Sequence, residues 1–501
     1  MNKNSTILFV TLLLASLAEL HAAEPPAAAS QSAANLVGEP CAPTIHYHPP
    51  GGSFGDPIPF FWKGEYHVFH LSTGVKGTPW QHIVSTDLIH WRQLPTALVA
   101  SGPPDGPDGG FQYTGSVTEK DGTFHIFYCG HNPQNPLGTE FTLHATSSDL
   151  ITWTKHPQDI IGPDGVIYRN ERQRGNARWV SWRDAYVFWN EDEQQHWMIM
   201  CSSPVKGGGT GLLTSKDLRT WKYEQPLAGG GVGECPDMFK IGKLWYLIGA
   251  GKYAVADSPR GPYREPPVCN AIDRPFIYAG KRMFDGKRHI WTGWFGGDSP
   301  RNGNKKGGGG GTQCMPRELY ADPGGQLYCK PVAEIIAVFK KTVLSKENIK
   351  VDATSTFDVP DNYMIECQVQ LDPKAELVIA LRQQPESGDA YRFTLSPEKS
   401  EAGLSVPEFS FKRPCPVDTT KPIKFQAFVH GKFVECFIND QYATSCRAYS
   451  YFKGKLTFEV KGGNAKVLSL SVKTDDGVLF VNPEDAKKVK VVKQDDMKSN
   501  K

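Results

Sequence analysis

A seven-residue pattern, Ser-x-Asp-Leu-x-x-Trp, occurs three times and constrains the fold of this chain more than any other feature. The copies are residues 85–91, 147–153 and 215–221, and a degenerate fourth copy follows at 256–263. Near-identical repeats at such spacing indicate structural units of one kind that pack against their neighbours. The chain is therefore predicted to contain a series of similar structural units.

Each unit also contains a stretch that is rich in aromatic and β-branched residues. These stretches are residues 66–69, 124–128, 197–200 and 244–248, and a fifth one at 289–294. Their composition and alternation predict β-strands. Strand, strand, Asp turn and Trp strand, repeated five times, predicts the blades of a propeller, in which radial repetition protects the sheet edges.

The repeated Asp and Trp have structural roles in this interpretation. Asp87, Asp149 and Asp217 are expected to cap turns by accepting hydrogen bonds from backbone N–H groups. The Trp that ends each copy is expected to pack between blades. The 50 glycines and 38 prolines of the chain agree with many short strands joined by turns.

A different pattern begins after residue 339. The repeat stops, but alternating segments continue at 364–369, 377–381 and 433–440, which predicts a β-sandwich. From residue 475 the chain becomes charged and rich in lysine. We therefore predict an all-β fold, with a five-bladed β-propeller at 44–338, a β-sandwich at 339–474 and a charged tail at 475–501.

The N-terminus predicts export. Lys3 precedes an apolar run at 7–17 and small residues at 20–23, which is the pattern of a secretory signal peptide over residues 1–22. The Ala-, Pro- and Ser-rich residues that follow predict a disordered leader at 23–43. The apolar run is too short to span a bilayer, so we expect a secreted or periplasmic protein without a membrane span.

Charge and cysteine content exclude other classes of function. The 55 Lys and Arg residues against 53 Asp and Glu give a net charge of +2, which offers no electrostatic case for binding nucleic acid. The 11 cysteines form no CxxC pair, and their odd number leaves at least one thiol free, so we expect mostly buried thiols. His46 and His48 lack an acidic or Cys partner at metal-ligand spacing, and no metal or cofactor is predicted.

Three acids occupy comparable early positions in three different units: Asp56, Asp184 and Glu234. The innermost strands of a propeller converge on its axis, so one axis can hold all three carboxyl groups. That arrangement suits glycoside hydrolysis, in which one carboxyl group protonates the leaving oxygen while another attacks or activates water. The alternative, that each acid caps a local turn, stays open at this point.

Several longer motifs resemble those of glycoside hydrolase family 32, the invertase, levanase and inulinase group. The resemblance covers nearly all of the chain after its leader and rests on residues 80–91, 113–116, 234–239, 276–279 and 315–319. The segment 234–239, Glu-Cys-Pro-Asp-Met-Phe, matches the Glu-Cys-Pro motif of that family. The resemblance independently implies a five-bladed propeller and action on an oligo- or polysaccharide.

The resemblance also implies roles for individual residues. Asp56 would be the nucleophile, Glu234 the general acid/base with an elevated pKa, and Asp184 the stabiliser of the transition state. The residues implied to hold the substrate are Arg183, Trp80, Thr114 and Tyr278. The implied enzyme is an exported β-fructofuranosidase that acts on sucrose or fructans with retention, which needs carboxyl groups about 5–5.5 Å apart.

The segment around Asp56 departs from the pattern of the family. Residues 53–59 read Ser-Phe-Gly-Asp-Pro-Ile-Pro in place of Trp-Met-Asn-Asp-Pro-Asn-Gly, Leu71 replaces a glutamine, and Ala185 replaces a proline. Lost hydrogen bonds to sugar hydroxyls change substrate discrimination. Two alternatives remain open: an inverting five-bladed enzyme for arabinosides or xylosides, with carboxyl groups about 6.5–9.5 Å apart, and a non-catalytic carbohydrate-binding propeller.

Overall fold

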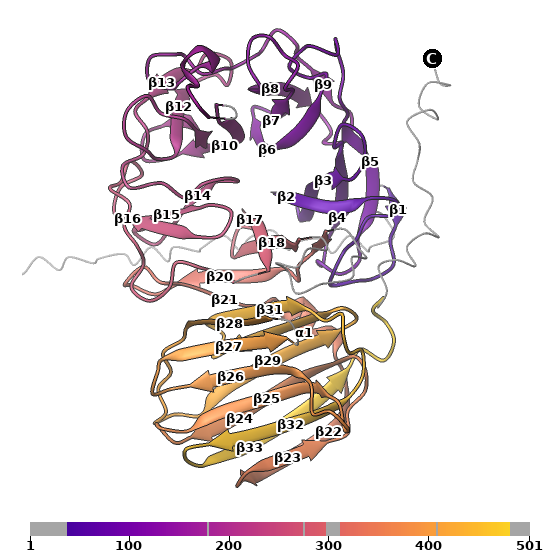
Figure 1. Ribbon diagram of the computed structural model, residues 1–501. Helices are drawn as coiled ribbons and strands as arrows, with labels where there is room; N and C mark the ends of the chain where they lie inside the picture. The colour runs from indigo at the N-terminus through magenta and orange to yellow at the C-terminus, as the bar shows by residue number, and fades with distance from the viewer. Residues whose placement is uncertain (1–37, 178–179, 274–275, 297–310, 407–408, 481–501) are drawn as a thin grey trace, which may run out of the picture.

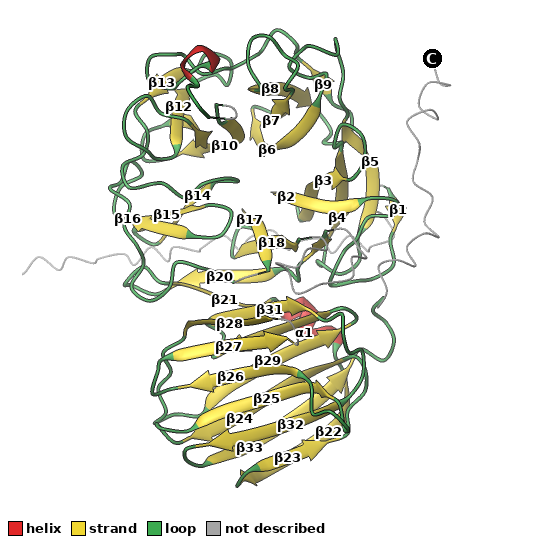
Figure 2. Ribbon diagram, in the orientation of Figure 1, coloured by secondary structure: helices red, strands yellow, loops and turns green. Residues whose placement is uncertain are grey.

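The computed structural model describes residues 38–480, except for 178–179, 274–275, 297–310 and 407–408. Five sheets surround a central axis, and two larger sheets form a second body beside them (Figure 1). The regular secondary structure of the described chain is almost all strand. Its helices are one short α-helix, α1 (Ala333–Val338), between the two bodies, and a 3-10 helix, Glu171–Gln173, before β10 (Figure 2). The predicted all-β fold, a five-bladed propeller followed by a sandwich, is confirmed. The predicted signal peptide lies outside the described residues.

The five propeller sheets are antiparallel and follow the chain as meanders, with two additions: β1 pairs with β5 at the outer edge of blade 1, and β19 pairs with β18 beside the path of blade 5. In blade 1 the strands are β1 (Glu39–Pro40), β2 (Ser53–Trp62), β3 (Glu65–Thr73), β4 (Trp80–Ser85) and β5 (Arg92–Leu98). In blade 2 they are β6 (Phe111–Lys120), β7 (Thr123–His131), β8 (Glu140–Ser147) and β9 (Thr154–Lys155). In blade 3 they are β10 (Trp182–Asn190), β11 (Gln195–Ser202), β12 (Gly211–Ser215) and β13 (Lys222–Glu224).

The last two blades complete the ring. In blade 4 the strands are β14 (Asp237–Ile241), β15 (Leu244–Ile248) and β16 (Tyr253–Ala256). In blade 5 they are β17 (Ile277–Phe284), β18 (His289–Phe295), β19 (Thr312–Gln313), β20 (Arg317–Ala321) and β21 (Leu327–Pro331). The five aromatic stretches in the sequence are strands, as predicted: they lie on β3, β7, β11, β15 and β18, each of which pairs with the innermost strand of its blade.

The repeated Asp caps a turn in every intact copy of the motif. Asp87 Oδ1 accepts hydrogen bonds from the N–H groups of Ile89, at 3.0 Å, and His90, at 2.8 Å. Equivalent pairs of bonds hold Asp149 and Asp217. The Leu after each Asp adopts a positive φ, 64°, 64° and 62° in chain order, so the carboxylate stabilises a turn that a branched side chain disfavours.

The Trp that ends the motif packs against the preceding blade. Trp153 of blade 2 meets Phe69 of blade 1 edge to face, with ring centroids 5.9 Å apart. Trp221 of blade 3 meets Phe127 of blade 2 in the same way at 5.5 Å. The predicted packing between blades is confirmed, because one aromatic contact recurs at successive blade boundaries.

Two predicted boundaries are wrong. Glu39–Pro40, assigned to the disordered leader, forms β1 and pairs with Arg92 and Gln93 of β5. Residues 475–480, assigned to the charged tail, pack on the body: Leu479 is buried, and Phe480 donates a backbone hydrogen bond to Pro43 at 2.7 Å. Both segments are fixed by contacts with distant parts of the chain, which local composition does not encode.

The second body is a sandwich of two six-stranded antiparallel sheets. One sheet contains, in spatial order, β22 (Lys341–Val351), β33 (Ala465–Thr474), β24 (Tyr363–Leu371), β29 (Ile423–His430), β30 (Phe433–Ile438) and β31 (Tyr442–Arg447). The other contains β23 (Thr354–Phe357), β32 (Lys455–Lys461), β25 (Glu376–Gln383), β26 (Tyr391–Ser396), β27 (Glu401–Val406) and β28 (Phe409–Pro414). The chain passes from β21, the last strand of the propeller, through α1 to β22, the first strand of the sandwich.

The propeller and the sandwich share one hydrophobic core and a buried charge network. Arg317 of β20 lies between Asp273 and Glu435, and its side chain and both acidic partners are 0% exposed. Glu435 of β30 also bonds His46 at 2.8 Å. His46 is thus a buried partner in this interface. All 11 cysteines are free, and eight of them are buried, as expected.

Candidate active site

The innermost strands of four blades contain one extra residue opposite the neighbouring strand. The pairing slips between Gly55 and Ile58 in β2, Tyr113 and Gly115 in β6, Arg183 and Tyr186 in β10, and Tyr278 and Lys281 in β17. A bulge of this kind breaks the strict alternation of side chains and re-aims them. Asp56 and Asp184 lie in two of these bulges, with φ of 20° and 64°. The bulges therefore turn carboxylates toward the axis.

Asp56 is partly buried and lies in the bulge of β2. Its Oδ1 accepts a hydrogen bond from the Trp294 indole at 3.1 Å, and its Oδ2 lies 3.7 Å from the Cys235 thiol. Burial raises the pKa of Asp56, and the positive charge of Lys281 is the main opposing influence. The carboxyl group is thus held at a site that resists its ionisation.

Asp184 lies beside Asp56 and is 4% exposed. Its Oδ2 accepts the backbone N–H of Cys235 at 2.8 Å, so Cys235 contacts both carboxyl groups. Burial raises the pKa of Asp184 to about 7, with the Asp56 charge adding to the rise and Arg183 opposing it. Two neighbouring acids therefore share one poorly solvated position on the axis.

Glu234 precedes β14 and is the most exposed of the three acids, at 43% of its side chain. Arg183 Nη2 donates to its Oε1 at 2.8 Å, and the Tyr278 hydroxyl donates to its Oε2. Partial burial opposes ionisation of Glu234, but the hydrogen bonds from Tyr278 and Arg183 outweigh it, so its pKa lies below the ordinary value. The expected elevated pKa is therefore wrong for this state of the protein, because two donors stabilise the carboxylate.

Arg183 is itself held in place by Glu140, which pattern reasoning did not single out. Glu140 is 3% exposed and accepts from Arg183 Nη1 at 3.1 Å and from the backbone N–H of Trp182 at 2.8 Å. His131 lies 3.1 Å from the same carboxylate. The guanidinium thus bridges a buried structural carboxylate and the more exposed Glu234.

The structure brings five of the seven predicted site residues together: Asp56, Asp184, Glu234, Arg183 and Tyr278. It places the other two differently, because Trp80 and Thr114 are both 0% exposed. Trp80 packs in the core between blades 1 and 2 and donates its indole N–H to Tyr113 O at 3.1 Å. Thr114 accepts a hydrogen bond from Lys281 Nζ at 3.2 Å. Direct contact of these two side chains with a substrate is therefore not supported.

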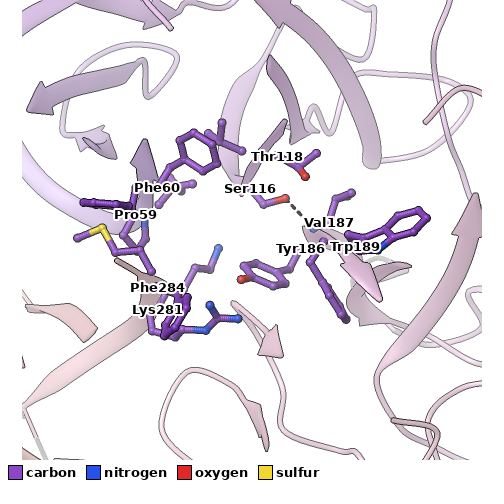
Figure 3. Close-up of a pocket in the computed structure, with 15 residues that line it drawn as sticks. Pro59, Phe60, Ser116, Thr118, Tyr186, Val187, Trp189, Lys281 and Phe284 are labelled. Carbon is purple, nitrogen blue, oxygen red and sulfur yellow. Dashed lines mark hydrogen bonds between the residues drawn. The ribbon is translucent and has the colours of Figure 1, made fainter. Parts of the chain in front are cut away.

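Past the bulges, the inner strands line a cavity of about 300 Å³. Its walls are residues 58–61 of β2, 116–118 of β6, 186–189 of β10 and 281–284 of β17. Lys281 and Tyr186 point into this space from two blades, whereas the Ser116 hydroxyl accepts the backbone N–H of Val187 at 2.8 Å (Figure 3). Because all four stretches follow the bulges in their strands, the cavity lies on the far side of the carboxylates along the channel.

The described residues show neither a metal site nor a membrane-spanning helix. Among the residues that the structure describes, no three or more His, Cys, Asp and Glu side chains are arranged to hold a metal ion. The described chain also contains no helix that is long and apolar enough to cross a membrane.

The chain is similar to known proteins in sequence and in structure. A family model described as "Glycosyl hydrolases family 32 N-terminal domain" matches residues 46–331. A raffinose invertase of Escherichia coli is 26% identical over 467 residues, which cover 81% of this chain and 89% of that protein. An insoluble β-fructofuranosidase isoenzyme of Arabidopsis thaliana is 29% identical over 350 residues, 60% of this chain and 59% of its own length.

Solved structures agree in fold. The exo-inulinase of Aspergillus awamori superposes with a TM-score of 0.68 at 18% identity, covering 86% of this chain and 98% of that one. The fructan 1-exohydrolase IIa of Cichorium intybus gives a TM-score of 0.69 at 18% identity, covering 86% and 96%. At this level of identity the match concerns the architecture, a propeller joined to a sandwich.

Proposed function

The chain belongs to glycoside hydrolase family 32, and from this premise we propose that it hydrolyses β-fructofuranosidic bonds with retention of configuration. The observation that carries the proposal is the convergence of Asp56, Asp184 and Glu234 around Cys235 and Arg183 at one level of the propeller channel. Relatives named invertase and β-fructofuranosidase support the choice of fructose as the sugar. Export is a further proposal, which rests on the predicted signal peptide at residues 1–22.

In the first step, the Asp56 carboxylate attacks the anomeric carbon of the fructosyl unit. The bond from that carbon to the bridging oxygen breaks, and Glu234 gives its proton to the departing oxygen. Asp184 faces the developing positive charge on the sugar ring. In the second step, Glu234 takes a proton from water, the water oxygen bonds to the anomeric carbon, and Asp56 leaves as a carboxylate.

To act as an acid, Glu234 must be protonated, but the contacts in the substrate-free site favour its ionised form. Arg183 and Tyr278 both donate to Glu234 and lower its pKa. A sugar that inserts its hydroxyl groups among these donors replaces one or both contacts and covers the exposed part of Glu234. Both changes raise the pKa of the carboxyl group, because desolvation increases while stabilising donors are lost. Substrate binding thus prepares the acid.

The substrate panel must extend beyond fructans because the surroundings of Asp56 differ from the family pattern. A Cβ added at Gly55 would meet the Thr73 methyl group at 2.7 Å, so the space next to the nucleophile is filled from β3. A different set of contacts therefore surrounds the sugar, and another furanoside is the second candidate substrate.

Sugar release tests the proposal. Purified protein and the variant Asp56→Ala are incubated with sucrose, inulin, levan, arabinan and arabinoxylan, and the products are separated by chromatography. The matched control is Asp149→Ala, which removes an aspartate from a capping turn of blade 2 and leaves the three site carboxylates in place. We expect fructose from the wild type and from Asp149→Ala, and none from Asp56→Ala.

The alternatives predict other results. Pentose release that depends on Asp56 would keep the carboxylates but reject fructose as the sugar. An inverting enzyme would give products of inverted configuration and no covalent sugar on Asp56 under trapping conditions. A wild-type protein that cleaves none of the five substrates would contradict fructosyl hydrolysis of these compounds.

A further inference from the structure

Lys281 is a buried cation at the centre of the propeller. It lies on β17, its residue is 1% exposed, and Figure 3 shows its side chain pointing into the channel. A buried ammonium group lowers stability unless nearby acceptors and negative charge compensate for its lost hydration. The structure must therefore contain groups that stabilise the buried charge of Lys281, which a solvent-exposed lysine would not need.

The hydrogen bonds of Lys281 explain its anchoring but not its charge. Its Nζ donates to Gly115 O at 2.8 Å and to Thr114 Oγ1 at 3.2 Å, so it ties blade 5 to blade 2 across the channel. Both acceptors are neutral. Among the described residues, no carboxylate forms a direct ion pair with it. The compensating negative charge must act from beyond contact distance.

The bulge in β17 brings Lys281 to the channel. In a regular strand, residues three apart face opposite sides of the sheet. The extra residue between Tyr278 and Lys281 removes this opposition, and Ala279 takes a φ of 49° to allow it. One face of β17 therefore presents both Tyr278, which bonds Glu234, and Lys281.

The charge of Lys281 acts on the carboxylates. It is the largest influence that opposes the burial of Asp56, and it also favours the ionised form of Asp184. The other titratable and charged groups that face this position are Arg183, Asp184 and Tyr186 from β10, Glu234 and Cys235 before β14, and Tyr278 and Arg282 from β17. Arg183 is engaged by Glu140 and Glu234, and Arg282 by Asp237. Lys281 also lines the same cavity as Ile58, which follows Asp56 by two residues on β2. Lys281 is thus the cation assigned to Asp56.

We propose that Lys281 is a positioning residue for the nucleophile, whose anchored ammonium group keeps Asp56 ionised and ready to attack. This inference rests on the proposed function, because it assigns Asp56 the role of nucleophile. Thr114 gains a role in the same arrangement: it fixes the ammonium on the axis and does not contact the sugar.

The pH dependence of kcat/KM tests this role in the full-length enzyme. Two variants with an uncharged side chain at position 281 are compared with the wild type, on a substrate that the wild type cleaves. Lys281→Met removes the charge and the hydrogen bonds, whereas Lys281→Gln removes the charge but keeps a donor for Gly115 O. We expect the acidic limb of the profile to move upward by about one to two pH units in both variants. Activity on that limb then falls about 10- to 100-fold, while the basic limb stays in place.

The pH profiles distinguish the proposed role of Lys281 from a purely structural one. A shift of the acidic limb in both variants supports the inference. A uniform loss of kcat/KM at every pH, or an effect in Lys281→Met alone, would show that Lys281 acts only as a tie between blades and would overturn it. If Lys281→Met does not fold, the profile of Lys281→Gln decides alone. Failure of the proposed function has a different signature, since the wild type itself would then release no fructose.

Discussion

Replacing Asp184 by Asn should make the protein more stable as well as inactive, and the gain should grow with pH. Asp184 is buried, and its pKa is raised from 3.8 to about 7, first by loss of hydration and then by the charge of Asp56. An acid whose folded pKa lies above its unfolded value favours folding while it is protonated. That stability is fully present below pH 3.8 and is lost as the pH rises through about 7. Asn removes the titration and can still accept the N–H of Cys235.

The size of the effect follows from the two pKa values. A rise of about three pH units corresponds to about 4 kcal/mol, at about 1.4 kcal/mol for each unit. At pH 8 nearly all of this destabilisation is present in the wild type, whereas at pH 5 only about 1.6 kcal/mol is. The stability advantage of Asp184→Asn over the wild type should therefore increase by about 2–3 kcal/mol between pH 5 and pH 8. Other titrating groups are common to both proteins and largely cancel in the difference.

Equilibrium unfolding in urea at pH 5 and pH 8 measures this increase. The matched control is Asp149→Asn at a capping turn, where the hydrogen bonds to backbone N–H groups outweigh burial and lower the pKa of Asp149. A lowered pKa contributes stability that is already complete above pH 5, so this variant should be less stable than the wild type by the same amount at both pH values. An equal difference between Asp184→Asn and the wild type at the two pH values would refute the reasoning.

Three further predictions concern groups around the site and in the core. Glu140→Gln weakens the hold on Arg183, and sugar-release assays should show kcat/KM lower by about 10- to 100-fold. Glu435→Gln leaves Arg317 with one buried acidic partner, and urea unfolding should show a loss of about 3–5 kcal/mol. Burial lowers the pKa of His70 to about 3. Below pH 6.5 this histidine should therefore lower the free energy of unfolding by about 1.4 kcal/mol for each pH unit. In urea unfolding, His70→Phe should remove this contribution to the pH dependence.

Specific results would contradict these three predictions. Unchanged kcat/KM in Glu140→Gln would show that Arg183 is positioned by other contacts. A loss below 1 kcal/mol in Glu435→Gln would mean that the buried network is neutral in the protein. An identical pH slope for His70→Phe and the wild type would show that His70 takes up a proton in the folded state.

Much of the fold could be predicted because the repeated motif is local. The Asp87 turn is closed by residues two and three positions later, so its pattern is written in consecutive residues. The two wrong boundaries depend on contacts between distant segments. Glu39–Pro40 is too short to show alternation and is defined by its pairing with β5. Phe480 is placed by a bond to Pro43, which lies more than four hundred residues earlier.

The carboxylates of the site could be predicted from their shared place in successive units, but their supports could not. Glu140 lies 43 residues before Arg183 in the chain, and only the meeting of blades 2 and 3 brings them within 3.1 Å. Lys281 follows a bulge in β17, so a prediction from simple alternation would place its side chain on the wrong face of the sheet. Trp80 lay in a recognisable motif, but that motif maintains packing between blades and not contact with a sugar.

The bulges connect the stability of this propeller to its chemistry. They turn acids and their counter-charges toward an axis where hydration is poor, and the raised pKa values of Asp56 and Asp184 are the result. A regular inner strand would pack without this strain, but it would not present Tyr278 and Lys281 on one face of β17. Arg183 and Lys281 offset only part of the burial of two acids. Variants that neutralise Asp184 should therefore gain stability. Variants that neutralise Lys281 should lose stability, and a smaller fraction of Asp56 should be ionised in them. The two opposite responses have one cause, the arrangement of charges on the propeller axis.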